Sequence, residues 1–303
     1  MLNKEEIKLL QEKYKLTEEE YQEYYQKVNF VFTTGKKKNN ESKKLVFVAG
    51  QSGAGKSMLI PVVNEQLGHD AVIADYDIVR SLHPKFKQAI QEVPQDIHLA
   101  LLIDANRANE DLRHYCRDNG INLIYEGTMR GTQVFIDIAN EFKEVGYEID
   151  LSLMAVPQLE SYGSTLLRYA IDLHENNFPR WVPKQVHDES YEKFVITLKE
   201  LSDRELFDKA TVYRRGTEIE ERKPVEIYST TNRQFHDPIE AILYGREQYR
   251  KNAIEEYDRK HSLVYQIFMQ KDPSLLEKLK DWEELYAREI YEMSKQSTGV
   301  EIK

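Results

Sequence analysis

The spacing of apolar residues divides this chain into a helical beginning, a central part in which strands alternate with helices, and a helical end. Within residues 3–33, aromatic and aliphatic side chains recur every three or four positions. Thr17 and Glu20 have the spacing of a helix N-terminal capping box and precede Tyr21, Tyr24, Tyr25 and Val28. This pattern predicts one or two helices, followed by a polar linker over residues 35–43.

The central part carries short apolar runs between stretches of helical periodicity. The predicted strands cover residues 45–49, 71–74, 122–125 and 148–156. The predicted helices cover residues 58–67, 95–118, 132–145, 158–175 and 189–206. Strands that alternate with helices form a parallel sheet covered by helices, so the pattern predicts an α/β fold. The later elements are a polar loop, a strand or hairpin, and a charged, tyrosine-rich helical end, over 176–187, 211–214 with 225–228, and 238 onward.

The composition is that of a globular protein with an acidic balance. Lys and Arg number 42 against 52 Asp and Glu, which gives a formal net charge of −10. Because proteins bind nucleic-acid backbones mainly through clustered Lys and Arg, this balance argues against a nucleic-acid partner. No run approaches the roughly 18–20 apolar residues that span a bilayer, so no membrane partner is expected. Cys116 is the only cysteine, and residues 1–10 lack the apolar region of a secretory signal, which together favour a reducing, cytoplasmic location.

The first predicted strand runs directly into a complete phosphate-binding loop (P-loop), Gly-x-x-x-x-Gly-Lys-Ser. Its glycines allow backbone N–H groups to point at phosphate oxygens, and the N-terminus of the next helix favours the same negative charge. Lys56 can reach the β- and γ-phosphates of a nucleoside triphosphate, and the Ser57 hydroxyl can ligate Mg²⁺. The residues expected to hold the nucleotide are Gly50, Gln51, Ser52, Gly53, Ala54, Gly55, Lys56 and Ser57.

Acidic residues follow two other predicted strands. Ligands of a parallel sheet bind at the carboxyl ends of its strands, where Asp75, Asp77 and Glu126 fall. Asp77 is placed to act as a general base toward a substrate hydroxyl, while Asp75 and Glu126 can orient substrate or metal-bound water. Aspartates after a strand are also ordinary turn residues, so both interpretations of Asp75 and Asp77 stay open. A carboxylate directly after Leu-Ile-Tyr is costly unless it is used or paired, which favours a role for Glu126.

Two arginines lie downstream of the sheet. Arg168 falls in the predicted helix 158–175, and Arg180 in the loop after it. Guanidinium groups on a mobile segment can clamp the oxygens of a transferring phosphoryl group. Two surface arginines in ion pairs would give the same sequence, and the residues alone favour that simpler interpretation.

Five segments in order resemble the zeta toxin family, the kinases of bacterial toxin–antitoxin pairs, which include the PezT-type toxins. The resemblance covers roughly residues 17–230. The P-loop alone indicates only nucleotide binding, whereas the His-Pro, Glu-Gly-Thr-x-Arg and Met-Ala-Val-Pro sequences together are specific. The segments are Ala49–Ser57; Asp75–Arg80 with His83-Pro84; Tyr125–Arg130; Met154–Pro157 with Ser161-Tyr162 and Arg168-Tyr169; and Pro183–Asp188.

The resemblance implies a P-loop NTPase fold similar to adenylate kinase: a parallel sheet flanked by helices, here with additional N- and C-terminal helices. It implies ATP and Mg²⁺ as cofactors and UDP-N-acetylglucosamine as substrate, phosphorylated on the 3′-hydroxyl of its amino sugar. The product cannot feed peptidoglycan synthesis, which makes such kinases toxic. The resemblance also implies a small helical antitoxin that obstructs the ATP site.

Carried over residue by residue, the resemblance makes Asp77 the catalytic base. It makes Arg168 and Arg180 the two phosphate-clamping arginines, joined in the catalytic set by Lys56 and Glu126. A structural role for His83, fixing the loop after the base, is equally compatible with its position before Pro84. The residues expected on the substrate side are Asp75, Arg80, His83, Glu126, Thr128 and Arg130.

The expected domain organisation has three parts. Residues 1–43 form an N-terminal helical segment and linker, 44–232 the P-loop kinase core, and 233–303 a C-terminal helical extension packed on the core. The resemblance does not reach residues 1–16 or the extension, whose apolar positions could instead pack on another chain. Because residues 1–16 are too few to replace a helical antitoxin, a separate antitoxin is expected, with an inhibitory role for this segment as the alternative.

Two other functions are open on the sequence alone. A related kinase could use another hydroxyl acceptor, such as an antibiotic, another sugar or a polynucleotide end. A regulatory module could instead bind and slowly hydrolyse a nucleotide without any acceptor, while its tail engages a partner.

Overall fold

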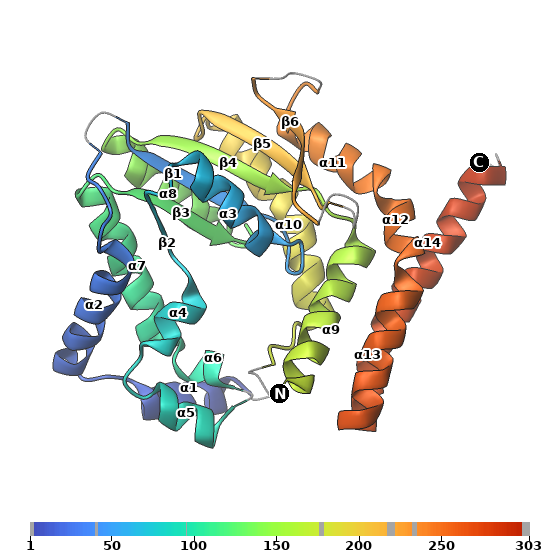
Figure 1. Cartoon of the computed structure of the whole chain (residues 1–303), viewed down its shortest axis with the longest axis horizontal. Coiled ribbons are helices and arrows are strands. Elements are labelled where there is room, and N and C mark those ends of the chain that lie inside the picture. Colours follow the sequence, from blue (N-terminus) through green and yellow to red (C-terminus); the bar gives the residue numbers. More distant parts are fainter. Residues whose placement is uncertain are drawn as a thin grey trace. The chain divides into compact units, whose positions relative to one another are not determined.

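A computed structural model describes most of the chain (Figure 1). The chain divides into two compact units. The described residues are 3–39, 42–94, 96–175, 179–216, 222–231 and 235–298. The first unit comprises Met1–Phe47, Ile60–Glu126 and Ala139–Asp150. The second comprises Val48–Leu59, Gly127–Ile138 and Leu151–Lys303. Each unit therefore combines stretches that lie far apart in the sequence.

The strands of the described residues form one six-stranded sheet in the order β2-β3-β1-β4-β5-β6. β2 pairs in parallel with β3, with Ile73 opposite Ile124, whereas β5 and β6 pair antiparallel. The predicted strands are all present. The predicted late hairpin corresponds to the antiparallel pair β5 and β6 at one edge of the sheet. The strands are β1 Lys44–Ala49, β2 Ala71–Ile73, β3 Asn122–Gly127, β4 Glu148–Met154, β5 Lys209–Arg214 and β6 Val225–Ser229.

The N-terminal helices α1, Lys4–Tyr14, and α2, Glu18–Thr33, belong to the first unit. The predicted capping box is confirmed, because the Glu20 N–H donates to the Thr17 hydroxyl at 3.3 Å and the Thr17 N–H donates to the Glu20 carboxylate at 2.8 Å. α2 packs along α7, Leu102–Asp118 (Figure 1). The capped, amphipathic α2 thus buries its aromatic face within this unit.

Short helices occupy a stretch for which the pattern gave no prediction. They are α4 Tyr76–Ser81 and α5 Phe86–Glu92. The helix predicted over residues 95–118 is instead two helices, the short α6 Ile97–Ala100 and the longer α7. Helices of one or two turns show no clear periodicity and are unstable alone. α4 forms because the Asp75 carboxylate caps it, accepting from the Asp77 and Ile78 N–H groups at 2.7 and 3.3 Å.

The second unit holds most of the remaining helices. α10 begins at Lys184 rather than at residue 189 as the pattern predicted, because Pro183 is tolerated at a helix start and the helix extends into the expected loop. α3 Lys56–Gln66, which follows the P-loop and contains Pro61, and α8 Thr132–Glu144 are each divided between the two units. The others are α9 Gln158–His174, α10 Lys184–Asp203, α11 Pro238–Gln248, α12 Arg250–Glu255, α13 Tyr257–Lys271, the 3₁₀ helix η1 Pro273–Leu279 and α14 Lys280–Thr298.

The C-terminal helices α13 and α14 pack against α9 (Figure 1). Trp282 of α14 is the centre of this contact: its side chain is buried, and its Nε1–H donates to the Leu159 carbonyl at 3.2 Å. The indole lies over Gly163 of α9, where a Cβ atom would come within 2.1 Å of the ring. The glycine therefore allows the two helices to approach closely, and the apolar residues around it form one cluster.

This contact decides whether a substitution at Gly163 stabilises or destabilises the fold. Glycine to alanine inside a helix usually stabilises by about 0.5–1 kcal/mol. Gly163→Ala should instead lower the free energy of unfolding by about 1–3 kcal/mol, because the methyl group overpacks the indole. Denaturant titration measures the change. In a Trp282→Ala background the same substitution should become neutral or stabilising, and equal effects in both backgrounds would refute the assignment.

Candidate active site

The P-loop connects β1 to α3 and is held by contacts within the second unit. The Lys56 side chain is nearly buried, and its ammonium group donates to the Gly50 and Gln51 carbonyls at 3.0 and 3.3 Å. Ser57 lies beside it at the start of α3 and is exposed. This places a cation, a free hydroxyl and a helix N-terminus in one turn, the chemistry that binds a phosphate chain with its magnesium ion.

Two glycines of the loop have backbone conformations that other residues rarely adopt. Gly53 has φ +74°, and a Cβ atom there would lie 2.0 Å from the Ser161 carbonyl oxygen of α9. Gly55 has φ +91°, and its Cβ would lie 3.0 Å from the Arg215 Nε atom. The loop therefore needs glycine for the close approach of α9 and of Arg215 as well as for its own turn.

Arg215 is the main residue of this site that sequence reasoning missed. It follows β5, and its guanidinium donates to the carbonyls of Gly53 and, at 3.3 Å, of Ala54. It also donates to the Glu160 carboxylate at 3.1 Å and to the Ser164 hydroxyl at 2.8 Å. One side chain thus joins the P-loop to α9. The only signal in the sequence was a pair of arginines before Gly216, at the end of a predicted strand.

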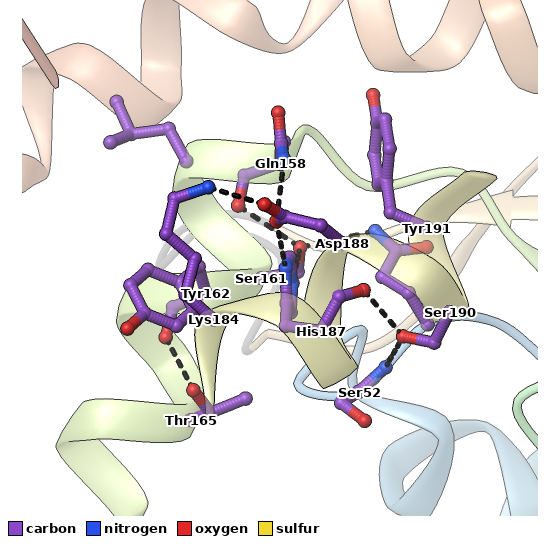
Figure 2. A network of polar contacts seen from close by, with 12 residues as sticks. Ser52, Gln158, Ser161, Tyr162, Thr165, Lys184, His187, Asp188, Ser190 and Tyr191 are labelled. Atoms are coloured by element: carbon purple, nitrogen blue, oxygen red, sulfur yellow. Dashed lines mark hydrogen bonds and ion pairs between the residues drawn. The ribbon is translucent and has the colours of Figure 1, made fainter. Parts of the chain in front are cut away.

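A chain of buried polar groups holds the other side of the loop (Figure 2). The Gln51 amide is buried, and its NH₂ group donates to the Val156 carbonyl at 2.7 Å and to the Ser161 hydroxyl at 3.2 Å. Ser161 lies 2.9 Å from Nε2 of His187 on α10. The Ser52 N–H donates to the Ser190 hydroxyl at 3.3 Å. α9 and α10 therefore fix the loop through both its side chains and its backbone.

His187 lies at the centre of this network of buried polar groups. Burial lowers its pKa below the ordinary value of 6.5, and the cations Lys184 and Arg246 act in the same direction, whereas Asp188 opposes them. The Asp188 pKa is depressed although burial opposes this, because His187, Lys184 and Gln158 donate to its carboxylate. With His187 neutral and Asp188 ionised, Nδ1–H donates to the carboxylate at 3.2 Å and Nε2 accepts from Ser161.

Arg246 of α11 is the last member of this network of polar groups. It is buried, which lowers the pKa of its guanidinium. The guanidinium carbon lies over the aromatic ring of Tyr191, 3.7 Å from the ring centroid. It donates to the Tyr191 carbonyl at 3.1 Å and to the Gln51 side-chain oxygen at 3.4 Å. This residue lies in the C-terminal region, so the extension contacts the P-loop directly.

The predicted base side lies in the first unit. β2 and β3 are parallel neighbours, so Asp75, shortly after β2, and Glu126, near the end of β3, belong to strands that end at the same edge. Asp75 caps α4, the ordinary turn chemistry that the sequence left open for it. Asp77 is exposed and forms an ion pair with Arg80, whose Nε–H donates to the Tyr76 carbonyl at 3.1 Å. Glu126 is also exposed.

His83 lies in the interior of the same unit. Its ring is 3.4 Å from the Asp104 carboxylate, and its Nδ1 accepts from the Lys85 N–H at 3.1 Å. Asp104 also accepts the Leu16 N–H at 3.0 Å, and the Tyr24 hydroxyl donates to the Val79 carbonyl at 2.8 Å. These contacts favour the structural role for His83: with Tyr24 and Asp104 they tie the loop after α4 to the N-terminal helices.

The segment after β3 is shaped by α10. Met129 has φ +54°, an uncommon conformation for a side chain of its size, and its carbonyl accepts from the Thr197 hydroxyl at 2.6 Å. The flanking Thr128 is half-buried, and Arg130 is exposed with its guanidinium 4.0 Å from the Glu189 carboxylate. Strained backbone held by its surroundings is common at functional sites.

The two predicted clamp arginines belong to the second unit. Arg168 is exposed on α9, one turn after Ser164, which contacts Arg215. Arg180 is half-buried. Its neighbour Trp181 packs edge-on against Tyr169 of α9 at 5.6 Å, which anchors the described end of this loop.

The described residues contain no cluster of three or more His, Cys, Asp or Glu side chains that could bind a metal ion by itself. Among the helices of the described part of the chain, none is at once long and apolar enough to cross a bilayer.

Comparison with known proteins identifies the family. The family model described as zeta toxin matches residues 31–231, which is more than half of the chain. This chain belongs to the zeta toxin family. It is 30% identical over 221 residues to toxin zeta of Enterococcus hirae, covering 73% of this chain and 74% of that protein. It is 28% identical to toxin PezT of Streptococcus pneumoniae, covering 72% and 85%.

Solved structures agree with this assignment. A structure from the PezAT chromosomal toxin–antitoxin system of Streptococcus pneumoniae has a TM-score of 0.71 and 26% identity, covering 84% of this chain and 98% of that chain. A structure of the AvrRxo1-ORF1:-ORF2 complex has a TM-score of 0.55 at 11% identity, covering 82% and 85%, which is a likeness of fold. The α/β fold similar to P-loop kinases is therefore the one that the sequence predicts.

The buried His187 makes stability depend on pH. Unfolded chains take up a proton at this residue below about pH 6.5, whereas burial keeps the folded imidazole neutral, so stability should fall as the pH drops through that value. His187→Gln should lower the free energy of unfolding by about 1–3 kcal/mol at neutral pH and reduce its slope between about pH 7 and 5.5. Denaturant titrations at several pH values measure both effects. His174→Gln, at an exposed position of α9, is the control, and an equal change of slope in both variants would contradict the assignment.

Proposed function

We propose that this protein is an ATP-dependent kinase that phosphorylates the 3′-hydroxyl of the amino sugar of UDP-N-acetylglucosamine and so blocks cell-wall synthesis. The observation that carries the proposal is the P-loop between β1 and α3, fixed by α9, α10 and Arg215, in a chain of the zeta toxin family. A structure of AvrRxo1-ORF1:-ORF2, whose fold is similar, contains ATP. This supports ATP as the nucleotide of the present loop.

In this proposal Lys56 leaves the loop carbonyls to contact the β- and γ-phosphates, and the backbone N–H groups of the loop bind the same oxygens. Mg²⁺ bound with ATP would neutralise charge on the phosphates. The exposed Ser57 hydroxyl, a hard oxygen ligand at the helix start, fits such an ion. Arg215 is engaged with loop carbonyls, so its role is to position the loop for the phosphate chain.

Asp77 is proposed as the general base. Its exposed carboxylate is open to a substrate hydroxyl, and the ion pair with Arg80 orients it. Asp75 supports this role indirectly, since its cap sets the direction of α4. Glu126, Thr128 and Arg130 remain proposed substrate-side residues.

Arg168 and Arg180 are proposed to stabilise the charge of the transferring phosphoryl group. The position of Arg168 supports this, because Glu160, Ser164 and Arg168 recur at four-residue intervals along α9 and the first two contact Arg215. A separate helical antitoxin is proposed as partner. The similar structures come from the PezAT toxin–antitoxin system and from a complex of AvrRxo1-ORF1 with -ORF2.

The acceptor and the base can be tested together. Wild-type protein with ATP, Mg²⁺ and UDP-N-acetylglucosamine should give a product one phosphoryl group heavier by mass spectrometry. Asp77→Asn should lower turnover about 10²- to 10⁴-fold with ATP affinity nearly unchanged, because only proton removal is lost. Asp118→Asn removes a similarly exposed aspartate paired with an arginine and should retain full activity. Normal turnover of Asp77→Asn would refute the base, and an acceptor panel would identify another substrate.

Lys56→Ala separates the kinase from a nucleotide-dependent binding module. Loss of the phosphate-binding ammonium should weaken ATP binding and lower the rate of phosphoryl transfer by at least about 10²-fold. Bacteria expressing the variant should grow normally. Calorimetry and growth curves measure these effects. Lys199→Ala, at an exposed lysine in a surface ion pair, serves as control. Toxicity that survives Lys56→Ala would favour the binding module instead.

A further inference from the structure

A cavity in the second unit opens beside the P-loop. Its volume is about 290 Å³, and its lining includes Gly55 and Ser57, the residues on either side of Lys56. Ligand pockets commonly measure about 300–1,000 Å³, so the space is sufficient for part of a small molecule. A nucleotide with its phosphates on the loop can extend its nucleoside into this cavity.

The C-terminal region supplies part of the wall. Glu256 and Lys260 line the cavity together with Glu160, Ser164 and Leu167 of α9. The family model ends at residue 231, so Glu256 and Lys260 lie outside the matched range. The helix that carries Lys260 is nonetheless firmly attached, because α13 and α9 share one buried apolar cluster.

The chemistry of the lining fits a nucleoside better than a further phosphate. Four charged groups of the lining form two pairs: the Lys260 ammonium is 2.6 Å from the Glu256 carboxylate, and Arg215 contacts Glu160. With Arg222 the described lining has three cations and two carboxylates, a formal net charge of only +1, which gives limited attraction for a further anion. Met154, Leu167 and Pro224 add apolar surface on which a flat base can lie, and carboxylates can accept hydrogen bonds from ribose hydroxyls.

Lys260 is well placed to contact the bound molecule. Only 13% of its side chain is exposed, against 40% for Glu256, and its ammonium group is paired with the carboxylate of this second lining residue. A positioned ammonium can donate to a ring nitrogen of a base or lie over its π face.

We propose that Lys260, oriented by Glu256, binds the nucleoside of the bound nucleotide, so that α13 completes the nucleotide site. The inference rests on the proposed function, since it requires a nucleoside triphosphate on the P-loop. It assigns to the C-terminal helices a role in substrate binding in addition to packing.

The test compares binding of ATP with binding of inorganic tripolyphosphate, which has the phosphates without the nucleoside. In Lys260→Met, which retains the apolar stem, calorimetry should show ATP binding weakened about 10-fold and tripolyphosphate binding unchanged. Lys260→Arg should recover part of the ATP affinity. Lys251→Met is the matched control, because Lys251 forms a lysine–glutamate pair at the same spacing on the neighbouring helix but is 72% exposed.

The outcomes are distinguishable. Unchanged ATP affinity in Lys260→Met, or an equal loss for both ligands, would overturn the inference and leave the proposed kinase intact. If wild-type protein binds tripolyphosphate as tightly as ATP, the cavity receives no nucleoside and the inference also fails. If wild-type protein binds neither ligand, the proposed function fails with it. Thermal melting of every variant confirms that the fold is retained.

Discussion

The contact between the P-loop and α9 is the constraint on which the second unit depends. At Gly53 the loop passes so close to the Ser161 carbonyl that no side chain fits, and the Gln51 amide is buried against α9 at the same place. A phosphate-binding loop needs its N–H groups fixed before the ligand arrives, since ordering them on binding would reduce affinity. α9 therefore acts as the support of the loop, and the helices packed on α9 support it in turn.

The polar chain from Arg246 to Lys184 extends this support over three helices. Each member has at least one partner, as buried polar groups require, although the buried Nε atom of Arg246 has none among the described residues. Burial lowers the pKa of His187 and so favours its neutral form within this network. The segment Pro183–Asp188, which resembles the family, therefore has a structural role: through His187 it supports the P-loop without requiring contact with substrate.

In the first unit a comparable set of contacts supports α4. Tyr24, His83 and Asp104 connect the loop after α4 to the N-terminal helices, so that residues 3–33 help to orient the helix that carries Asp77. The residues proposed for catalysis lie mostly exposed, whereas Tyr24, His83 and Asp104 are buried. This division is typical of sites built on rigid elements with a supporting layer of hydrogen bonds.

The sequence by itself determined the strands, the longer helices, the capping box at Thr17 and the P-loop, because each depends on local periodicity or on residues adjacent in the chain. It also identified the zeta toxin family from short ordered motifs. The helix α4 and the early start of α10 have local causes, the Asp75 cap and Pro183, which the periodicity did not reveal. Only the tertiary structure decided the roles of Arg215 and His187. Those features arise from contacts between residues distant in sequence, such as Arg215 with Gly53 or Ser161 with His187, and no local pattern records which distant side chains will meet.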